Sequence, residues 1–360
     1  MSSGPLIFLV AGEPSGDQLG ARLMAELQRA TGGAVRFAGV GGERMQAQGL
    51  DSLYPMEELS VMGLAEVLPH LQRILRRLSE TERAARQLAP DAIVTIDSPS
   101  FTLRLMRRLD GIGCPRIHYV APQVWAWKPW RAKAMAGYLD RLLALLPFEP
   151  PIFERHGLET SFVGHPVVET AGRTFDAAGF RRDHQIPETA PMICVLPGSR
   201  QSEVRRLLPV FEETATRLAD RVPDLHAVVP TVRAVQGRVR EATRAWPIPV
   251  TVVEGAEARY AAFAASQAAI AASGTVAVEL AVANLPAVIA YRVNAITAAM
   301  ARRLIRVRYV SLANLVLDRQ VQPELLQQDC TPQKLAEALG PLLDDPKVRA
   351  DYVAGCREAA

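Results

Sequence analysis

The sequence contains few cysteines and few lysines. Its four cysteines lie far apart among 360 residues, without a C-x-x-C spacing. This disfavours a zinc site or a disulfide framework and fits a reducing compartment. Lysine also occurs only four times, so most of the 41 basic residues are arginines, and against 38 acidic residues they leave a net charge of +3. So weak a charge does not indicate a nucleic-acid partner.

The sequence also lacks the long apolar runs of exported and membrane-spanning proteins. Its first apolar run covers only residues 6–10 and has no basic region before it, so we expect no signal peptide. The least charged stretch, 260–291, is interrupted by polar residues and gives no run of about 18 apolar residues. We therefore expect a cytoplasmic protein.

Apolar residues are nevertheless plentiful, at 49% of the chain beside 22% charged residues. The length favours two domains of roughly 150 residues each. Short apolar runs alternate with longer helical patterns, which is typical of βαβ units around parallel sheets. The runs with the length of strands are 6–10, 35–40, 92–96, 117–120 and 142–146, then 192–196, 225–229, 250–253, 268–272 and 287–291.

A polar segment, 169–191, separates the two sets of runs and contains no apolar run of strand length. We therefore predict an α/β fold of two doubly wound, Rossmann-like domains, with the first ending at residue 168. Open α/β sheets bind ligands at the carboxyl ends of their strands, so two such domains facing each other would enclose a cleft.

Two loops of the first half are candidates for chemistry at that cleft. The first run ends in a tight turn whose glycines and helix start could meet a ligand, although a Gly/Ser turn with an Asp cap explains the pattern equally well. The residues of that turn are Gly12, Glu13, Ser15, Gly16 and Asp17. Asp97 follows the run 92–96, where a carboxylate could act as a general base. Its alternative is a turn residue that caps the next helix.

The turn 120–131 holds three of the four tryptophans. Trp125 in this turn could stack on a sugar or contact a lipid chain, and buried packing explains it equally well. His165, just before the polar segment, either faces the cleft or has a structural role.

Two turns of the second half could hold a nucleotide diphosphate. The turn Gly198-Ser199-Arg200 combines backbone donors with a planar guanidinium, and Ser273-Gly274-Thr275 offers two hydroxyls to phosphate oxygens. Glu279, on the helix that follows, could accept hydrogen bonds from ribose hydroxyls. Each turn taken singly could equally be a helix cap.

The segment 60–78 predicts a helix with one apolar face and a cluster of arginines near its end. Such a helix either covers the sheet or lies on an anionic membrane surface, where it could receive an acyl chain. The residues proposed for a membrane or acyl-binding surface are Met62, Leu64, Val67, Leu68, Leu71 and Leu75, with Arg73, Arg76 and Arg77.

Taken together, the motifs resemble the lipid-A-disaccharide synthase family (glycosyltransferase family 19). The segments that carry the resemblance occur in the family's order and cover nearly the whole chain: 11–17, 60–68, 96–99, 120–127, 146–149, 162–166, 196–200, 272–275 and 309–314. The resemblance implies a B-type glycosyltransferase fold, with an acceptor and lipid-binding domain at 1–168 and a UDP-sugar domain at 169–345. It also implies a C-terminal helix, 346–360, packed back on the first domain.

The implied reaction joins UDP-2,3-diacylglucosamine to 2,3-diacylglucosamine 1-phosphate, giving the β-1,6-linked lipid A disaccharide 1-phosphate and UDP with inversion. Asp97 matches the family's proposed general base. The positions implied in holding UDP are Gly198, Ser199, Arg200, Ser273, Gly274, Thr275, Glu279 and Asn314, with Glu324 and Gln327 as further candidates. The sequence contains no D-x-D motif, and we expect neither a metal nor a cofactor.

The expected location is the cytoplasmic side of the inner membrane, with peripheral attachment and no nucleic-acid partner. Two alternatives remain open at this point. One is an enzyme similar to UDP-N-acetylglucosamine 2-epimerase, which would need no acyl-binding surface. The other is a non-catalytic nucleotide-binding protein docked on membranes.

Overall fold

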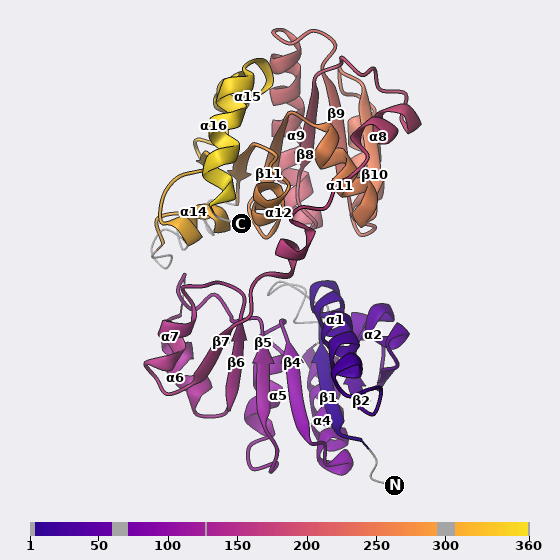
Figure 1. Cartoon of the computed structure of the whole chain (residues 1–360), viewed down its shortest axis with the longest axis vertical. Coiled ribbons are helices and arrows are strands. Elements are labelled where there is room, and N and C mark those ends of the chain that lie inside the picture. Colours follow the sequence, from indigo (N-terminus) through magenta and orange to yellow (C-terminus); the bar gives the residue numbers. More distant parts are fainter. Residues whose placement is uncertain (1–3, 60–70, 127, 294–306, 359–360) are drawn as a thin grey trace. The chain divides into compact units, whose positions relative to one another are not determined.

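The computed structural model describes residues 4–59, 71–126, 128–293 and 307–358. The chain forms two compact units, Met1–His165 and Pro166–Ala360 (Figure 1). The sequence places its boundary a few residues later, after residue 168, and the roles given to the two domains stay predictions.

The first unit is built on a seven-stranded parallel sheet in the order β3-β2-β1-β4-β5-β6-β7. Its strands are β1 (Leu6–Ala11), β2 (Arg36–Val40), β3 (Asp51–Ser52), β4 (Ala92–Ile96), β5 (Arg116–Tyr119), β6 (Arg141–Ala144) and β7 (Glu159–Phe162). The strand order reverses between β1 and β4, which pair directly with Ala11 opposite Ile96. The carboxyl ends of these two strands therefore flank a topological switch point, the usual ligand position in such sheets.

Helices cover both faces of this sheet (Figure 1). They are α1 (Pro14–Ala30), α2 (Glu43–Ala47), α4 (Leu71–Leu88), α5 (Thr102–Arg108), α6 (Trp130–Ala136) and α7 (Pro150–Glu154), with a short 3-10 helix, η1 (Met56–Glu58). One core contains Leu9, Met24 and Met45 beneath α1 and α2. The other contains Phe8 and Phe153, beneath α4 to α7. Neighbouring β1 residues enter different cores because successive side chains of a strand point to opposite faces.

The second unit has a six-stranded parallel sheet in the order β10-β9-β8-β11-β12-β13. Its strands are β8 (Met192–Leu196), β9 (His226–Thr231), β10 (Val250–Glu254), β11 (Ala268–Ala272), β12 (Ala287–Tyr291) and β13 (Glu324–Leu326). The order reverses between β8 and β11, so this sheet also has a switch point, flanked by the turns that follow these two strands.

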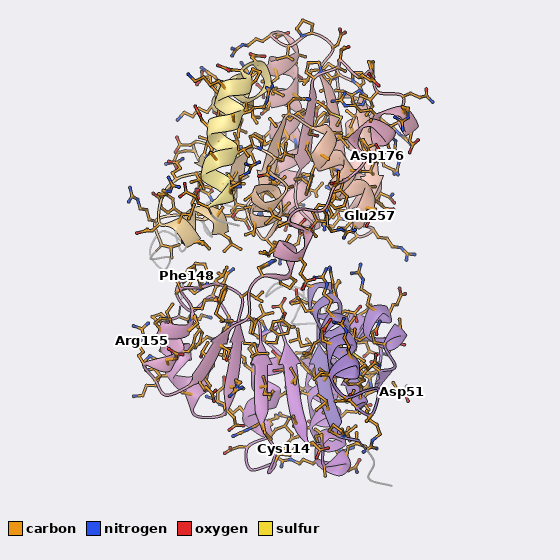
Figure 2. The ribbon with its side chains drawn as sticks, viewed as in Figure 1. Asp51, Cys114, Phe148, Arg155, Asp176 and Glu257 are labelled. Atoms are coloured by element: carbon orange, nitrogen blue, oxygen red, sulfur yellow. The ribbon has the colours of Figure 1, made fainter. Side chains whose placement is uncertain are left out.

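The second sheet is likewise covered on both faces. Its helices are α8 (Ala177–Asp183), α9 (Gln201–Ala219), α10 (Gln236–Thr243), α11 (Ala256–Ala265), α12 (Val276–Val282), α14 (Leu312–Leu317), α15 (Pro332–Asp344) and α16 (Pro346–Arg357), with a 3-10 helix, η3 (Pro166–Thr170). Leu207 of α9 and Leu339 of α15 enter one core, whereas Phe263 of α11 enters the other. Asp176, labelled in Figure 2, caps α8 by accepting a hydrogen bond from the Gly179 N–H at 2.7 Å.

Each of the ten predicted strand segments overlaps a strand, which confirms the α/β fold with two parallel sheets. The sequence did not predict β3, β7 and β13, which are short and lie at sheet edges. An edge strand has a single neighbour and more contact with solvent, so it does not need the continuous apolar run by which buried parallel strands are recognised.

Helix α16 packs against α15 and α12 of its own unit. The Tyr352 hydroxyl donates to the Ala287 carbonyl, and Cys356 is buried beside Ala281 and Ala313. The predicted packing of residues 346–360 on the first domain stays a prediction. No helix in the described ranges is long and apolar enough to cross a membrane.

Candidate active site

Asp97 lies at the switch point of the first sheet, directly after β4. Its carboxylate accepts a hydrogen bond from the Ser15 hydroxyl at 2.9 Å, which joins the loop after β4 to the loop after β1. Its backbone N–H donates to the Tyr119 carbonyl at 2.9 Å, and its carbonyl accepts from the Thr102 hydroxyl at 2.7 Å. The structure thus brings together Ser15 and Asp97, which the sequence predicted separately, and Asp97 is only partly buried.

The backbone around Asp97 is strained. Asp97 and Ser98 have φ values of 53° and 47°, and Val120, after the neighbouring β5, has a φ of 80°. Positive φ is uncommon outside glycine, and for a β-branched residue such as valine it is an outlier. Such strain gathers at functional sites, where the surrounding structure holds a conformation that the chain alone would not adopt.

Gly12 allows the two loops to approach each other closely. A Cβ atom at this position would lie 2.6 Å from the Ser98 Oγ and 2.9 Å from the Ser98 Cβ. At Gly16 a Cβ would lie 3.1 Å from the Ile96 carbonyl oxygen. The glycines of the first loop therefore serve the contact between the loops, whether or not they also face a ligand.

Asp17, predicted as a cleft residue, is engaged within the protein. It is 5% exposed, and its carboxylate accepts hydrogen bonds from the backbone N–H groups of Gly42 at 2.8 Å, Arg44 at 3.1 Å and Met45 at 3.1 Å. These groups lie at the start of α2, where a negative charge is favourable. The side chain of Asp17 thus fixes α2 to α1.

Trp125 is held by a buried carboxyl group that the sequence analysis left without a role. Glu149, in the loop between β6 and α7, is 2% exposed. Its Oε1 accepts from the Trp125 indole N–H at 3.2 Å, and its Oε2 accepts from the Leu146 N–H at 3.0 Å. The Trp125 ring also meets Phe148, labelled in Figure 2, edge to face with centroids 5.4 Å apart. Trp125 therefore packs within the first unit.

Burial raises the pKa of Glu149 to about 7, against the lowering effect of its hydrogen bonds. A carboxyl group whose pKa is raised in the folded state favours folding most below its ordinary pKa, 4.5, and that contribution is lost as the pH rises toward 7. We expect Glu149→Gln to remove this loss, so that between pH 4.5 and 8 the stability of the variant rises by about 3 kcal/mol relative to the wild type. Urea unfolding at several pH values measures it.

The amide of Glu149→Gln also turns an NH₂ group toward one of the two N–H donors, at a cost of about 1 kcal/mol that does not depend on pH. Glu154→Gln, an exposed position on α7, is the control for losing one charge. Parallel pH profiles for wild type and Glu149→Gln would contradict the prediction.

Two histidines of the first unit, His165 and His118, have different surroundings. Burial lowers the pKa of His165, and the nearby Arg22 charge lowers it further. His118 on β5, which the sequence analysis did not select, is fully buried, and its Nδ1 lies 2.8 Å from the Thr95 hydroxyl. Burial lowers its pKa to about 4, so this ring is neutral at physiological pH.

In the second unit, the turn after β8 is organised by Glu203. Its Oε2 accepts from the Ser199 N–H at 3.2 Å and the Arg200 N–H at 3.3 Å, and its Oε1 accepts from the Arg200 guanidinium at 3.2 Å. Gly198 has a φ of 106°, and a Cβ there would lie 2.4 Å from Glu203 Oε2. The Arg200 side chain remains 55% exposed. The turn thus presents a guanidinium beside the start of α9.

The second predicted turn follows β11 and leads into α12. The Ser273 hydroxyl donates to the Val310 carbonyl at 3.3 Å, whereas Thr275 is exposed and its side chain makes no capping hydrogen bond. Glu279, in the first turn of α12, forms an ion pair with Arg259. Both turns flank the same switch point of the second sheet, because they follow the neighbouring strands β8 and β11.

Asn314 has every hydrogen-bonding position of its amide occupied by protein. It is fully buried, donates to the Gln322 carbonyl and to Glu324 Oε1, each at 2.7 Å, and accepts from the N–H groups of Val321 at 2.7 Å and Gln322 at 2.8 Å. Glu324 in turn accepts from the N–H groups of Val310 and Ser311, each at 2.9 Å. Asn314 and Glu324 thus shape the segment 310–324.

Gln327, the other candidate of that region, follows β13 with a φ of 51°. Its side-chain oxygen accepts from the Val293 N–H at 3.4 Å, and its own N–H donates to the Tyr291 carbonyl at 2.9 Å.

The proposed membrane surface is only partly within the described residues. Met62, Leu64, Val67 and Leu68 lie outside them. On α4, Leu71 and Leu75 are 39% and 41% exposed, and Arg76 is also exposed. Arg77, in contrast, pairs with Glu58 and Glu80, each at 2.7 Å, and lies over the Tyr54 ring. Arg77 therefore has a structural role on this helix.

Some structurally important residues that were not predicted do carry a local pattern in the sequence. Glu203 stands three residues after the N-cap Arg200, which is the spacing of a capping box. Glu149 is a charged residue directly after the apolar Leu146-Pro147-Phe148. Gln322 and Arg259 have no local signal, because their partners come from distant parts of the chain.

Comparison with known proteins places the chain in a family. Residues 7–359 match the family model described as lipid-A-disaccharide synthetase. The chain is 56% identical to a lipid-A-disaccharide synthase of Rhodospirillum centenum over 357 residues, covering 99% of this chain and 89% of that protein. It is 53% identical to the synthase of Paramagnetospirillum magneticum over 358 residues, covering 98% and 92%.

Solved structures agree in fold at low sequence identity. UDP-GlcNAc 2-epimerase from Neisseria meningitidis, bound to UDP-GlcNAc, has a TM-score of 0.63 at 13% identity, covering 98% of this chain and 93% of its own. MurG of Acinetobacter baumannii has a TM-score of 0.58 at 15% identity, covering 99% and 95%. These likenesses show a fold like that of B-type glycosyltransferases and do not themselves separate an epimerase from a transferase. The family match makes that distinction: the chain belongs to the lipid-A-disaccharide synthetase family and is a glycosyltransferase with lipid-A-disaccharide synthase activity in lipid A biosynthesis.

Proposed function

We propose that Asp97 is the general base of this reaction and that the first unit binds the acceptor, 2,3-diacylglucosamine 1-phosphate. The observation that carries the proposal is the carboxylate at the switch point of the first sheet, held by Ser15 and by a strained backbone. Two loops fix this group, and it is only partly buried, so it can meet a substrate hydroxyl.

In the proposed step, Asp97 takes the proton of the acceptor 6-hydroxyl as that oxygen attacks the anomeric carbon of UDP-2,3-diacylglucosamine. The new C–O bond forms as the bond to the diphosphate breaks, and UDP leaves with the electron pair. A single displacement inverts the configuration at the anomeric carbon, which gives the β-1,6 linkage. The protein must therefore stabilise negative charge on the departing diphosphate.

We assign UDP binding to the second unit. The half-exposed Arg200 guanidinium lies at the start of the long helix α9, where both its charge and the helix dipole favour an anion. The Glu279 side chain is 14% exposed, so its carboxylate can accept a hydrogen bond from a ribose hydroxyl. Gln327 and the exposed Thr275 are further candidates for contacts with UDP. Asn314 and Glu324 act in this proposal by shaping the neighbouring segment.

We also assign α4 to a membrane surface that presents the acylated substrates. Its support is the exposure of Leu71 and Leu75 beside the arginines of the same helix. Sedimentation with anionic vesicles tests this assignment, and unchanged binding of Leu71→Ser/Leu75→Ser would contradict it.

The assay that tests the proposed reaction is UDP release in detergent from the two acylated sugars, with the product linkage read by NMR. We expect UDP only when both sugars are present, and a β-1,6 bond in the product. Turnover of UDP-N-acetylglucosamine alone would support an epimerase instead. Tight UDP binding without turnover of any acylated donor would support a non-catalytic protein.

A further inference from the structure

An ion pair in the second unit connects two helices on the same face of the sheet. Arg259 lies on α11 and Glu279 on α12, and both helices contribute side chains to the core on that face. Arg259 Nη2 is 3.2 Å from Glu279 Oε2, and the side chains are 33% and 14% exposed. The pair therefore stands at the edge of the core and is partly shielded from water.

The pair leaves hydrogen-bonding capacity unused. Glu279 Oε2 and Arg259 Nε are both buried, and in the part of the chain that the structure describes neither has a hydrogen-bond partner. Nη2 is close enough to Oε2 for charge attraction, but its orientation does not make a hydrogen bond. Arg259 therefore holds Oε2 on the protein side by charge attraction, and the carboxylate, on a side chain that is 14% exposed, can still accept a hydrogen bond from a ligand hydroxyl.

Arg259 lies over one aromatic ring, which two further rings hold in place. Its guanidinium carbon lies 5.3 Å from the centre of the Tyr260 ring, which stacks on Phe175 at 5.0 Å and meets Phe263 edge to face at 5.5 Å. Burial raises the pKa of Glu279, and the Arg259 charge lowers it. Arg259 therefore favours the carboxylate form of Glu279 from a fixed position.

We propose that Arg259 is a positioning residue for donor recognition, which holds Glu279 as an oriented carboxylate so that Glu279 accepts a hydrogen bond from a ribose hydroxyl. Arg259 itself does not touch the nucleotide in this assignment. The inference rests on the proposed binding of UDP by the second unit and adds to it a residue that acts through another.

The test compares two nucleotides by calorimetry, UDP and 2′,3′-dideoxyuridine 5′-diphosphate, which lacks the ribose hydroxyls. For wild type we expect the dideoxy compound to bind about tenfold more weakly than UDP, as expected for loss of a hydrogen bond to a charged group. Arg259→Met should weaken UDP binding about fivefold and leave the dideoxy compound unchanged. Arg259→Lys, which keeps the charge, should restore UDP binding to within about twofold of wild type.

Arg173→Met is the matched control, because Arg173 pairs with Glu257 at 3.3 Å on the exposed side of α11, where Figure 2 labels Glu257. It should bind both nucleotides as wild type does. Thermal unfolding of each variant shows that the second unit is folded.

Three results would overturn the inference in distinguishable ways. Equal weakening of both nucleotides by Arg259→Met would assign Arg259 a packing role. Unchanged UDP binding in Arg259→Met would remove any role for it in recognition. Equal affinity of wild type for the two nucleotides would instead refute the contact between Glu279 and ribose, and with it that part of the proposed function.

Discussion

Replacing Asp97 by asparagine is expected to lower kcat by roughly 10²- to 10⁴-fold, the range found for loss of a general base. The amide has almost the same shape and can still accept the hydrogen bond of Ser15, but it cannot take the proton of the acceptor hydroxyl. UDP affinity should stay within about twofold of wild type, because the proposed UDP-binding residues all belong to the second unit. Steady-state UDP release gives kcat, and calorimetry gives the UDP affinity.

The control for this substitution is Asp91→Asn, the same chemical change just before β4, at the amino ends of the strands rather than at their carboxyl ends. Asp91 accepts a hydrogen bond from the Leu6 N–H at 2.7 Å, near the amino end of β1. It should keep near-normal kcat. Turnover by Asp97→Asn within about fivefold of wild type would show that another group removes the proton.

Replacing Asn314 by alanine is expected to destabilise the second unit by about 2–4 kcal/mol. The side chain is fully buried, and its amide makes four hydrogen bonds, with Gln322 O, Glu324 Oε1 and the N–H groups of Val321 and Gln322. Alanine would leave the N–H groups of Val321 and Gln322 without their acceptor and the Gln322 carbonyl without its donor, whereas Glu324 Oε1 keeps the Ser311 N–H. Chemical unfolding followed by fluorescence or circular dichroism measures the change.

Gln328→Ala, which removes an exposed amide from the segment that follows, is the control and should change stability by about 0.5 kcal/mol or less. UDP binding separates the two readings of Asn314. If the role of Asn314 is structural, its replacement lowers stability, and UDP binding weakens only because the segment 310–324 loses its shape. Wild-type stability combined with tenfold weaker UDP binding would instead mean that Asn314 contacts the nucleotide directly.

The sequence predicted the sheets, and it predicted which loops follow their strands, because both follow from local patterns. Ten apolar runs identified the buried strands, and the carboxyl ends of parallel strands identified the loops that carry Asp97 and Arg200. Three edge strands were not predicted. The four residues of β7, for example, are mostly polar, and so short a segment does not indicate which strand it will pair with.

The partners of polar side chains were predicted less well, because chemistry alone does not say what a polar group meets in the fold. Asp17 and Arg77 were expected to face ligand or lipid, yet they contact the start of α2 and two acidic residues. Asn314 was predicted to hold UDP only because the chain resembles a family. Such a resemblance identifies a position but does not say whether its side chain contacts the ligand. Arg259 meets Glu279 twenty residues later along the chain, which no spacing within α11 indicates.

The strained turn after β4 has a consequence for attempts to make this enzyme more heat-resistant. Asp97 and Ser98 in this turn, and Val120 in the neighbouring turn after β5, hold positive φ values at a cost of order 1–3 kcal/mol each. A screen for thermal tolerance would favour glycine at Ser98 and Val120, since glycine adopts this conformation without strain. The same freedom would let the Asp97 carboxylate leave the geometry in which Ser15 holds it. Thermal tolerance and turnover are therefore opposed at this turn, and stabilising changes are better sought in the helices away from it.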